Sequence, residues 1–317
     1  MFKKKSDSFL AVDMAPEAVR LLDVSILRGA PAILDLATET LEPGAPETLP
    51  RRHLAALEKV LSARRLRGRC CLAAVPTSLV TTRSVMVDLT KPGTPDDQIR
   101  QTLRNIVACD ARDLLFDFWS VGEPNTQSRS YEVLVVATQR SIIHKYLDGF
   151  TRLKLACRHL DVAPCALASL IARLVPQQES MLGTVVLGEA LGYFAVVDQQ
   201  RVRFWRPFEL PPAKAGAPSA LERIGHEISK CVSHMVGSNN LDALGDILLF
   251  GHGVQDQTFA NYLAHRFNIR VKTPSPFDAL AADAVPAHLR DALAAGTATH
   301  YAAALGLALQ PQGGGNG

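Results

Sequence analysis

Apolar and polar residues alternate over residues 8–40 in three short runs, "SFLAVDM", "AVRLLDVSIL" and "PAILDLATETL". Alternation with a period of two predicts strands, and the tight turns between the runs predict that neighbouring strands are antiparallel. From Arg51 to Leu66 the leucines recur every three or four positions, which predicts an amphipathic helix. The wholly apolar run from Arg69 to Pro76 then predicts a buried parallel strand.

The same order of patterns returns in the second half of the chain. Three alternating runs occupy residues 182–210, a helical pattern runs from Ser219 to Val236, and a second apolar run extends from Asp246 to Gly253. A unit of three strands, a helix and a strand that occurs twice predicts an α/β protein with the duplicated ribonuclease H-like fold of actin and Hsp70. In that plan a nucleotide lies between the halves, held by the first hairpin turn of each.

Between the halves, residues 77–150 have elements of their own: a strand, a helix, two strands and a second helix. The first helix is predicted to begin at Thr94, because Pro95 suits the first helical position and the aspartates at 96 and 97 suit the helix dipole. We therefore expect a small inserted α/β subdomain. The predicted organisation is a first domain over residues 1–76, the insertion over 77–150, a return to the first domain with a linking helix over 151–180, a second domain over 181–309 and a disordered tail over 310–317.

Composition excludes several classes of function. The net charge of +3 is too small to indicate a nucleic-acid partner. The six cysteines have no CxxC spacing and lie in apolar segments, as reduced core residues do. No apolar run reaches the roughly 20 residues of a membrane-spanning helix, and no signal peptide is visible, so a cytoplasmic protein is expected. No metal site is expected, because the histidines and cysteines of residues 226–234 lack a third ligand.

Three segments are similar to the PilM family, the actin-like proteins of type IV pilus assembly. Residues 131–171 contain "EVLVVA", then "KYL", then "LDVAPCALA", which resemble the family's "EVLLVA", "KYL" and "LDVEPLAL". "DILLFGHGVQDQTFANYLAHRFNIRVKTPSPFD" resembles the family's "ILLSGGGA…GLAEYLAERLGIPV…NPF", and "YAAALGLAL" resembles its closing helix. The order and spacing of these segments cover about residues 8–309.

The resemblance implies a cytoplasmic assembly adaptor at the inner face of the inner membrane. Its partner would be the N-terminal cytoplasmic peptide of a PilN-like membrane protein, held between the first domain and the insertion. Further partners would be an assembly motor ATPase and a second copy of the chain. The machine would be a type IV pilus or a related type II secretion system.

The nucleotide-binding turns of the family are altered in this sequence. Where the family has "GIDIGSSSVK", this chain has "AVDMAPEAVR", so Asp13 is kept but the turn contains Pro16 and Glu17. Proline has no N–H to donate to a phosphate, and a glutamate would repel one. The alternative for Asp13 is a residue at a strand end that bonds to its own turn.

The other two glycine-containing turns are only partly kept. In place of "VDIGASSTTL" the chain has "VVLGEALGYF", which keeps Gly188 and loses the acidic and hydroxyl positions, and Glu189 adds a negative charge. In place of "GGGA" it keeps Gly251 and Gly253. A dinucleotide fingerprint is not supported, because the third glycine is Asp256 and no acidic residue ends the next strand.

Two functional classes remain open. The altered turns favour an adaptor that is not an enzyme and needs no cofactor, with Asp13, Gly188, Gly251 and Gly253 as a vestigial site. The alternative is a switch that binds Mg-ATP and gates pilus assembly. Candidates for the groove that holds the partner peptide lie on the first strand and helix of the insertion, with core packing as the alternative for each: Val85, Val87, Leu89, Ile99, Leu103 and Ile106.

Overall fold

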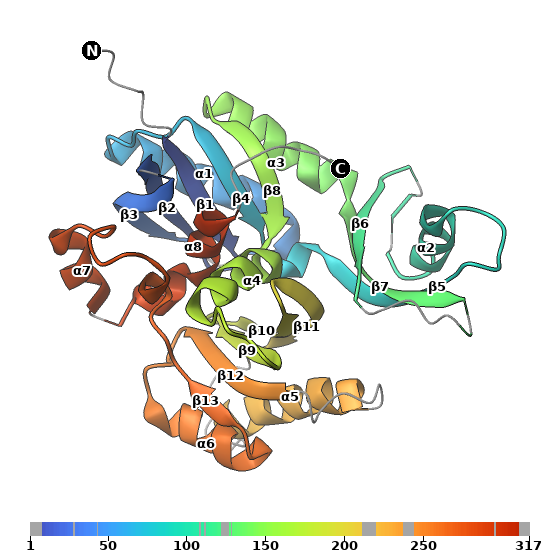
Figure 1. The fold of residues 1–317 in the computed structure, drawn as a ribbon. Helices are drawn as coiled ribbons and strands as arrows, with labels where there is room; N and C mark the ends of the chain where they lie inside the picture. The colour runs from blue at the N-terminus through green and yellow to red at the C-terminus, as the bar shows by residue number, and fades with distance from the viewer. Residues whose placement is uncertain are drawn as a thin grey trace.

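The computed structural model describes residues 8–27, 29–42, 44–107, 109–110, 112–121, 127, 129–210, 220–236, 244–294 and 296–310. They form two five-stranded sheets and one three-stranded sheet, with helices on the faces of each (Figure 1). The predicted disordered tail begins at residue 310, and its remaining residues lie outside the described part of the chain.

The first sheet has the strand order β3-β2-β1-β4-β8. Strands β1 to β3 are an antiparallel meander, whereas β4 and β8 run parallel to β1. The predicted three strands and buried parallel strand are confirmed, and β8 is an addition at the edge. The bounds are β1 Ser8–Ala15, β2 Ala18–Leu27, β3 Ala30–Thr40, β4 Cys70–Val75 and β8 Ala156–Val162.

The second sheet repeats this plan with the order β11-β10-β9-β12-β13. Its first three strands are again an antiparallel meander, and β12 and β13 again run parallel to the first strand. The duplicated ribonuclease H-like fold expected from the sequence is therefore confirmed. The bounds are β9 Met181–Leu187, β10 Leu191–Asp198, β11 Arg201–Glu209, β12 Leu244–Gly251 and β13 Arg270–Lys272.

Two apolar helices, α4 (Ala163–Leu174) and α8 (Ala302–Leu309), lie between the two sheets. Helix α8 packs on β1, β2 and β4, and α4 contacts strands of both sheets, so one apolar core joins the two halves. The two helices approach closely at Gly306, where an added Cβ would lie 2.1 Å from the carbonyl oxygen of Ala166. The second domain was predicted to extend to residue 309, but α8 belongs by its packing to the first sheet.

The remaining helices cover the outer faces of the sheets (Figure 1). Helices α1 (Leu49–Ala63) and α3 (Arg140–Arg152) pack together beside the first sheet. Helices α5 (Ala220–Val236) and α6 (Gln257–Phe267) share an apolar core with the second sheet. Helix α7 (Ala287–Ala294) precedes α8. No helix in the described ranges combines the length and the apolar character that crossing a bilayer requires.

The insertion is a separate small unit with its own apolar core. Its sheet has the order β5-β7-β6, with bounds β5 Thr81–Asp88, β6 Leu114–Ser120 and β7 Ser130–Gln139. Helix α2 (Pro95–Leu103) begins at Thr94, whose side chain accepts from the N–H of Asp97 while the Asp97 carboxylate accepts from the N–H of Thr94. This reciprocal pair confirms the predicted start of the helix.

The insertion is bonded directly to the second sheet. The indole N–H of Trp119 on β6 donates to the carbonyl oxygen of Val202 on β11 at 2.7 Å. The guanidinium of Arg203 donates in the other direction, to the carbonyl oxygen of Val121. These two bonds join the insertion to the second half of the duplicated fold.

Candidate functional site

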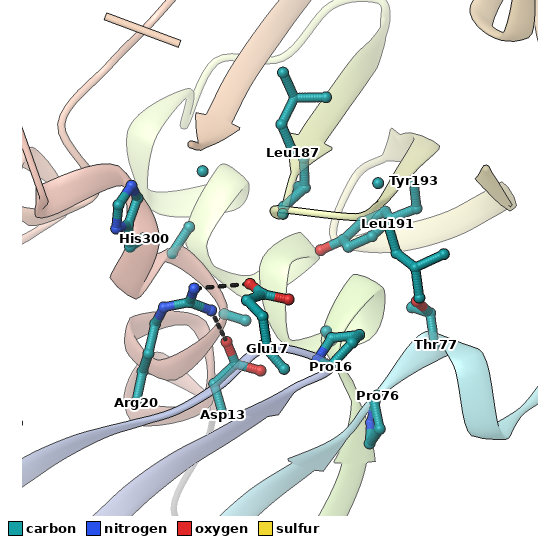
Figure 2. Close-up of a pocket in the computed structure, with 18 of the residues that line it drawn as sticks. Asp13, Pro16, Glu17, Arg20, Pro76, Thr77, Leu187, Leu191, Tyr193 and His300 are labelled. Carbon is teal, nitrogen blue, oxygen red and sulfur yellow. Dashed lines mark hydrogen bonds and ion pairs between the residues drawn. The ribbon is translucent and has the colours of Figure 1, made fainter. Parts of the chain in front are cut away.

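The first hairpin turns of the two halves face each other across a small cavity of about 60 Å³ (Figure 2). The turn between β1 and β2 forms one wall, and the turn between β9 and β10 forms the opposite wall. The end of β12 and the short helix at residues 298–301 close the third side. This is the place that a nucleotide occupies in the fold plan predicted from the sequence.

Asp13 and Arg20 form a buried ion pair on the floor of this cavity. They are opposite residues in the register of β1 and β2, so the hairpin itself brings them together. Each residue is 5% exposed, and a guanidinium nitrogen of Arg20 lies 3.6 Å from a carboxylate oxygen of Asp13. The carboxylate that a nucleotide site would use to hold a metal ion is thus paired with a cation of the chain itself.

Glu17 and His252 also contact the Arg20 guanidinium. Arg20 donates to the Glu17 carboxylate at 2.8 Å, as Figure 2 shows, and its Nη2 lies 3.3 Å from Nε2 of His252. A guanidinium can only donate, so Nε2 of His252 accepts. Because His252 belongs to the turn after β12, this bond joins the first half of the molecule to the second.

Glu17 also reaches the turn of the second half. One of its carboxylate oxygens lies 3.1 Å from the position that a Cβ on Gly188 would occupy. Gly188 closes its own turn by donating its N–H to the carbonyl oxygen of Leu191 at 2.8 Å. The space between the two hairpin turns is therefore occupied by the side chain of Glu17.

Two histidine rings stack beside this network. The rings of His252 and His300 lie with centroids 4.1 Å apart and planes inclined by 22°. Burial, the neighbouring His252 and the charge of Arg20 lower the pKa of His300 to about 4. Burial and Arg20 also lower the pKa of His252. Both rings are neutral at pH 7, so the positive charge of Arg20 is balanced by the carboxylates alone.

The pKa of Asp13 is raised to about 6. Burial is the largest cause, and it outweighs the opposing effect of the Arg20 charge. Glu17 raises the pKa further by adding a second negative charge nearby. We call Asp13, Glu17, Arg20, His252 and His300 the cleft cluster.

A buried histidine of α1 fixes the first turn from behind. Nε2 of His53 lies 2.8 Å from the carbonyl oxygen of Ala15, and Nδ1 lies 2.8 Å from the hydroxyl of Tyr146 on α3. A carbonyl only accepts, so Nε2 carries the ring proton and Nδ1 accepts from the tyrosine. Burial lowers the pKa of His53 to about 4, which keeps this arrangement intact at neutral pH.

The described residues do not suit a nucleotide. Pockets that bind ligands of drug size have volumes of about 300–1,000 Å³, several times that of this cavity. The first turn consists of Pro16 and Glu17, since Ala15 pairs with Ala18. Pro16 has no N–H to donate to a phosphate, and Glu17 places a negative charge where a phosphate would bind. The arrangement can hold the two hairpins together, but it presents no set of donors to a triphosphate.

Three of the four predicted vestigial residues line the cavity: Asp13, Gly188 and Gly251. Gly251 has φ +97°, and a Cβ there would lie 2.0 Å from the carbonyl oxygen of Leu187, so only glycine is accommodated. Gly253 has φ +69° with open space around it, and it is outside the cavity lining. No motif in the sequence pointed to His300. His252 could have been inferred from its place between two turn glycines.

The candidates for the partner groove are mostly interior residues. Val85, Val87, Ile99 and Leu103 are buried in the core between α2 and the sheet of the insertion. Leu89 is exposed and Ile106 is half-buried. The burial favours core packing for the first four, and the location of a partner groove remains a prediction.

The fold of the chain is similar to that of solved structures, although no similar sequence was found. No family model matches the sequence, and a search of curated proteins finds no match. A solved PilM–PilN type IV pilus biogenesis complex is similar with a TM-score of 0.78 and 18% identity, over 95% of this chain and 98% of that chain. A Bacteroides thetaiotaomicron protein with an actin-like ATPase fold and unknown function is similar with a TM-score of 0.54 and 8% identity, over 88% of this chain and 98% of that chain.

The chain therefore has the actin-like ATPase fold. Within that class its arrangement is like that of PilM, and the fold that the resemblance implied is confirmed. At these identities the likeness extends to the fold alone.

Proposed function

We propose that this chain is a PilM-like assembly adaptor of a type IV pilus, or of a related type II secretion system, and that it does not hydrolyse ATP. It docks the N-terminal cytoplasmic peptide of a PilN-like membrane protein, and it acts at the inner face of the inner membrane. The likeness to a solved PilM–PilN complex over nearly the whole chain supports the adaptor class.

The observation that carries the proposal is the occupation of the cleft by the chain's own side chains. Arg20 bridges Asp13 and Glu17 and reaches His252 of the other half. In an ATP-driven switch the same space has to open to a triphosphate and a metal ion. Here the two halves are bonded to each other, which suits a docking platform of one shape.

The alternative, a switch that binds Mg-ATP, is tested by calorimetric titration. We expect no heat at millimolar Mg-ATP and no hydrolysis above that of the Asp13→Ala variant. Micromolar binding that is lost in Asp13→Ala would support the alternative. The triple variant Pro16→Ser, Glu17→Ser, Arg20→Lys restores a polar turn and a lysine, and a gain of ATP binding in it would show that the cleft cluster is what excludes the nucleotide.

The adaptor itself is tested by titrating N-terminal peptides of PilN-like proteins into the purified chain. We expect one peptide to bind with a micromolar dissociation constant, and a scrambled peptide of the same composition not to bind. Failure of every such peptide would count against an adaptor of this kind, whatever the result with ATP.

A further inference from the structure

Strand β5 of the insertion has one free edge. Among the strands of the described residues it pairs with β7 only, and its register with β7 is unbroken over all eight residues. In an antiparallel ladder the backbone groups of alternate residues point to opposite edges. The N–H and C=O of Asp88 point away from β7, because both are bonded to the side-chain amide of Gln98 on α2. The N–H of Leu89 points the other way, to Arg129 at the end of β7.

This alternation assigns the free edge to three residues. Counting back from Asp88, the N–H and C=O of Met86, Ser84 and Thr82 point outward, and they have no backbone partner among the described residues. Ser84 and Met86 are exposed, the latter by 58%. Natural sheets protect such edges with prolines, bulges or a covering element. Over these three residues β5 has neither a proline nor a bulge.

The side-chain amide of Gln98 shows that a peptide-like group can bind this edge. It donates to the carbonyl oxygen of Asp88 at 2.9 Å and accepts from its N–H at 3.0 Å, as the peptide group of an added strand would. One position of the edge is thus already covered by a group with the chemistry of a peptide. The next two outward positions along the strand lack such cover.

Residues 80–84, which include the first part of β5, line a hollow of about 430 Å³ beside strand β11 of the second sheet, and Met86 is outside this lining. A hydrogen bond joins the two strands, in which the hydroxyl of Thr82 donates to the carbonyl oxygen of Trp205. On the β11 side the exposed Pro207 offers no N–H, which prevents strand addition there. An extended peptide in the hollow would therefore pair with β5 rather than with β11.

The charge of the hollow indicates which peptide it would accept. Two exposed arginines, Arg83 and Arg206, line it from opposite sides, and its described lining residues include no carboxylate. Neither arginine has an ion-pair partner within the described ranges. The apolar part of the described lining comes from Val80, Leu134, Phe204, Trp205 and Pro207.

We propose that the β5 edge binds an extended segment of another protein as an added strand, and that this segment alternates acidic with apolar side chains. The backbone of the segment pairs with Ser84 and Met86. Its carboxylates lie between Arg83 and Arg206, and its apolar side chains contact Met86 and Phe204. This surface is separate from the cleft between the two first hairpins. It lies on the same strand as the candidates for the partner groove, but it consists of the outward backbone groups of β5 and not of the buried side chains of Val85 and Val87.

The probe is a synthetic acetylated peptide of four valine-glutamate repeats. Hydrogen exchange of the chain with and without the peptide reports on β5. We expect slower exchange in the segment that contains β5 and unchanged exchange in β10. A peptide with lysine in place of glutamate, and one with N-methylated valines, each remove one of the two required features. Both are expected to bind at least about tenfold more weakly, because a tenfold change corresponds to roughly the loss of one net hydrogen bond.

Two variants of the chain test the same two features. Ser84→Pro removes an outward N–H without disturbing the ladder to β7, and Arg83→Glu with Arg206→Glu reverses the charge. Each is expected to weaken binding about tenfold or more, while the exposed Arg158→Glu on β8 leaves it within about twofold. Unfolding temperatures close to that of the parent show that the variants are folded.

No binding of the acidic peptide at millimolar concentration would overturn the proposal. So would binding that neither Ser84→Pro nor the double charge reversal weakens. Binding of PilN-like peptides with unchanged exchange in β5, together with no binding of the acidic peptide, would overturn this proposal and leave the adaptor function standing.

Discussion

The two halves of the molecule repeat one arrangement of strands, yet their first hairpins meet the cleft with different chemistry. The first hairpin contributes three charged side chains, Asp13, Glu17 and Arg20, all nearly removed from solvent. The second contributes Val186, Gly188 and Leu191, with no charge in the lining. Its only charged turn residue, Glu189, is exposed.

The comparison shows that one arrangement of strands is kept with different chemistry in the two first hairpins. The sheets are specified by apolar alternation and by the core that α4 and α8 share with both of them. What joins the turns across the cleft can be a ligand or side chains. Here the first half supplies the charged side chains, and the second half supplies a turn with Gly188 that leaves room for Glu17.

The largest effect on stability is expected from removing the buried charge of Arg20 in the first half. Arg20→Met leaves two buried carboxylates without their cation, so we expect a loss of about 3–5 kcal/mol of unfolding free energy, measured by urea denaturation at pH 7. The matched change in the second half is Lys230→Met, which breaks a surface pair with Glu227 on α5 and should cost less than about 1 kcal/mol. Similar costs for both variants would contradict the structural role of Arg20.

The next effect tests the backbone of the second half. Gly251→Ala places a Cβ against the carbonyl of Leu187 in a left-handed conformation, and we expect a loss of about 3 kcal/mol. Gly253→Ala is the control, since it shares the positive φ but meets open space, and its cost should be about 1 kcal/mol. Thermal and urea unfolding of both variants measure the difference. Equal losses would mean that the contact with Leu187 is not the cause.

The cleft cluster also predicts an unusual dependence of stability on pH. The pKa of Asp13 is about 6 in the folded chain and near 3.8 when unfolded, so the folded state binds more protons between these values. Its contribution is therefore fully present below pH 3.8 and is lost as the pH rises to 6. His53 and His300, with pKa values lowered from 6.5 to about 4, contribute in the opposite direction, and their contribution is lost as the pH falls from 6.5 to 4.

Asp13→Asn removes only the first of these opposing contributions. We expect the unfolding free energy of the variant to rise more steeply than that of the parent between pH 4 and pH 6, with a difference of about 3 kcal/mol accumulated across this range. Urea unfolding at half-unit steps of pH measures both slopes. Parallel curves would mean that the carboxyl group of Asp13 has an ordinary pKa.

The smallest effect compares the same position in the two turns. Glu17→Gln weakens a buried ion pair with Arg20, and we expect a loss of about 1–2 kcal/mol. Glu189→Gln changes an exposed residue and should stay within about 0.5 kcal/mol of the parent. Chemical denaturation of the two variants side by side decides the point. A larger loss in Glu189→Gln would contradict the conclusion that the stabilising charged groups belong to the first hairpin.

Most of the fold could be predicted because the strands obey a period of two and occur in the same order twice. Strand β8 was missed, since it is a sheet edge whose exposed and half-buried residues, such as Cys157 and His159, show no clear alternation. The packing of α8 on the first sheet was also missed. A helix that is apolar on every side, as α8 is, carries no periodic signal that says which sheet it contacts.

The site was predictable only where local geometry decides it. Asp13 and Arg20 face each other because a two-residue turn fixes the register of β1 and β2, so their ion pair could have been inferred from the spacing. Glu17 was expected to repel a phosphate, and in the structure its charge is paired with Arg20. His300 comes from a distant segment, and its place beside His252 depends on the packing of the whole second half.

The position of α8 has a consequence for how the chain is made. The ribosome synthesises α8 after both sheets, yet α8 lies between them and is buried on every side. A nascent chain that stops before residue 302 leaves the inner face of the first sheet without its cover. The interior is thus completed only after α8 has been synthesised, and a chain that stops before α8 exposes an apolar surface that chaperones and proteases can recognise.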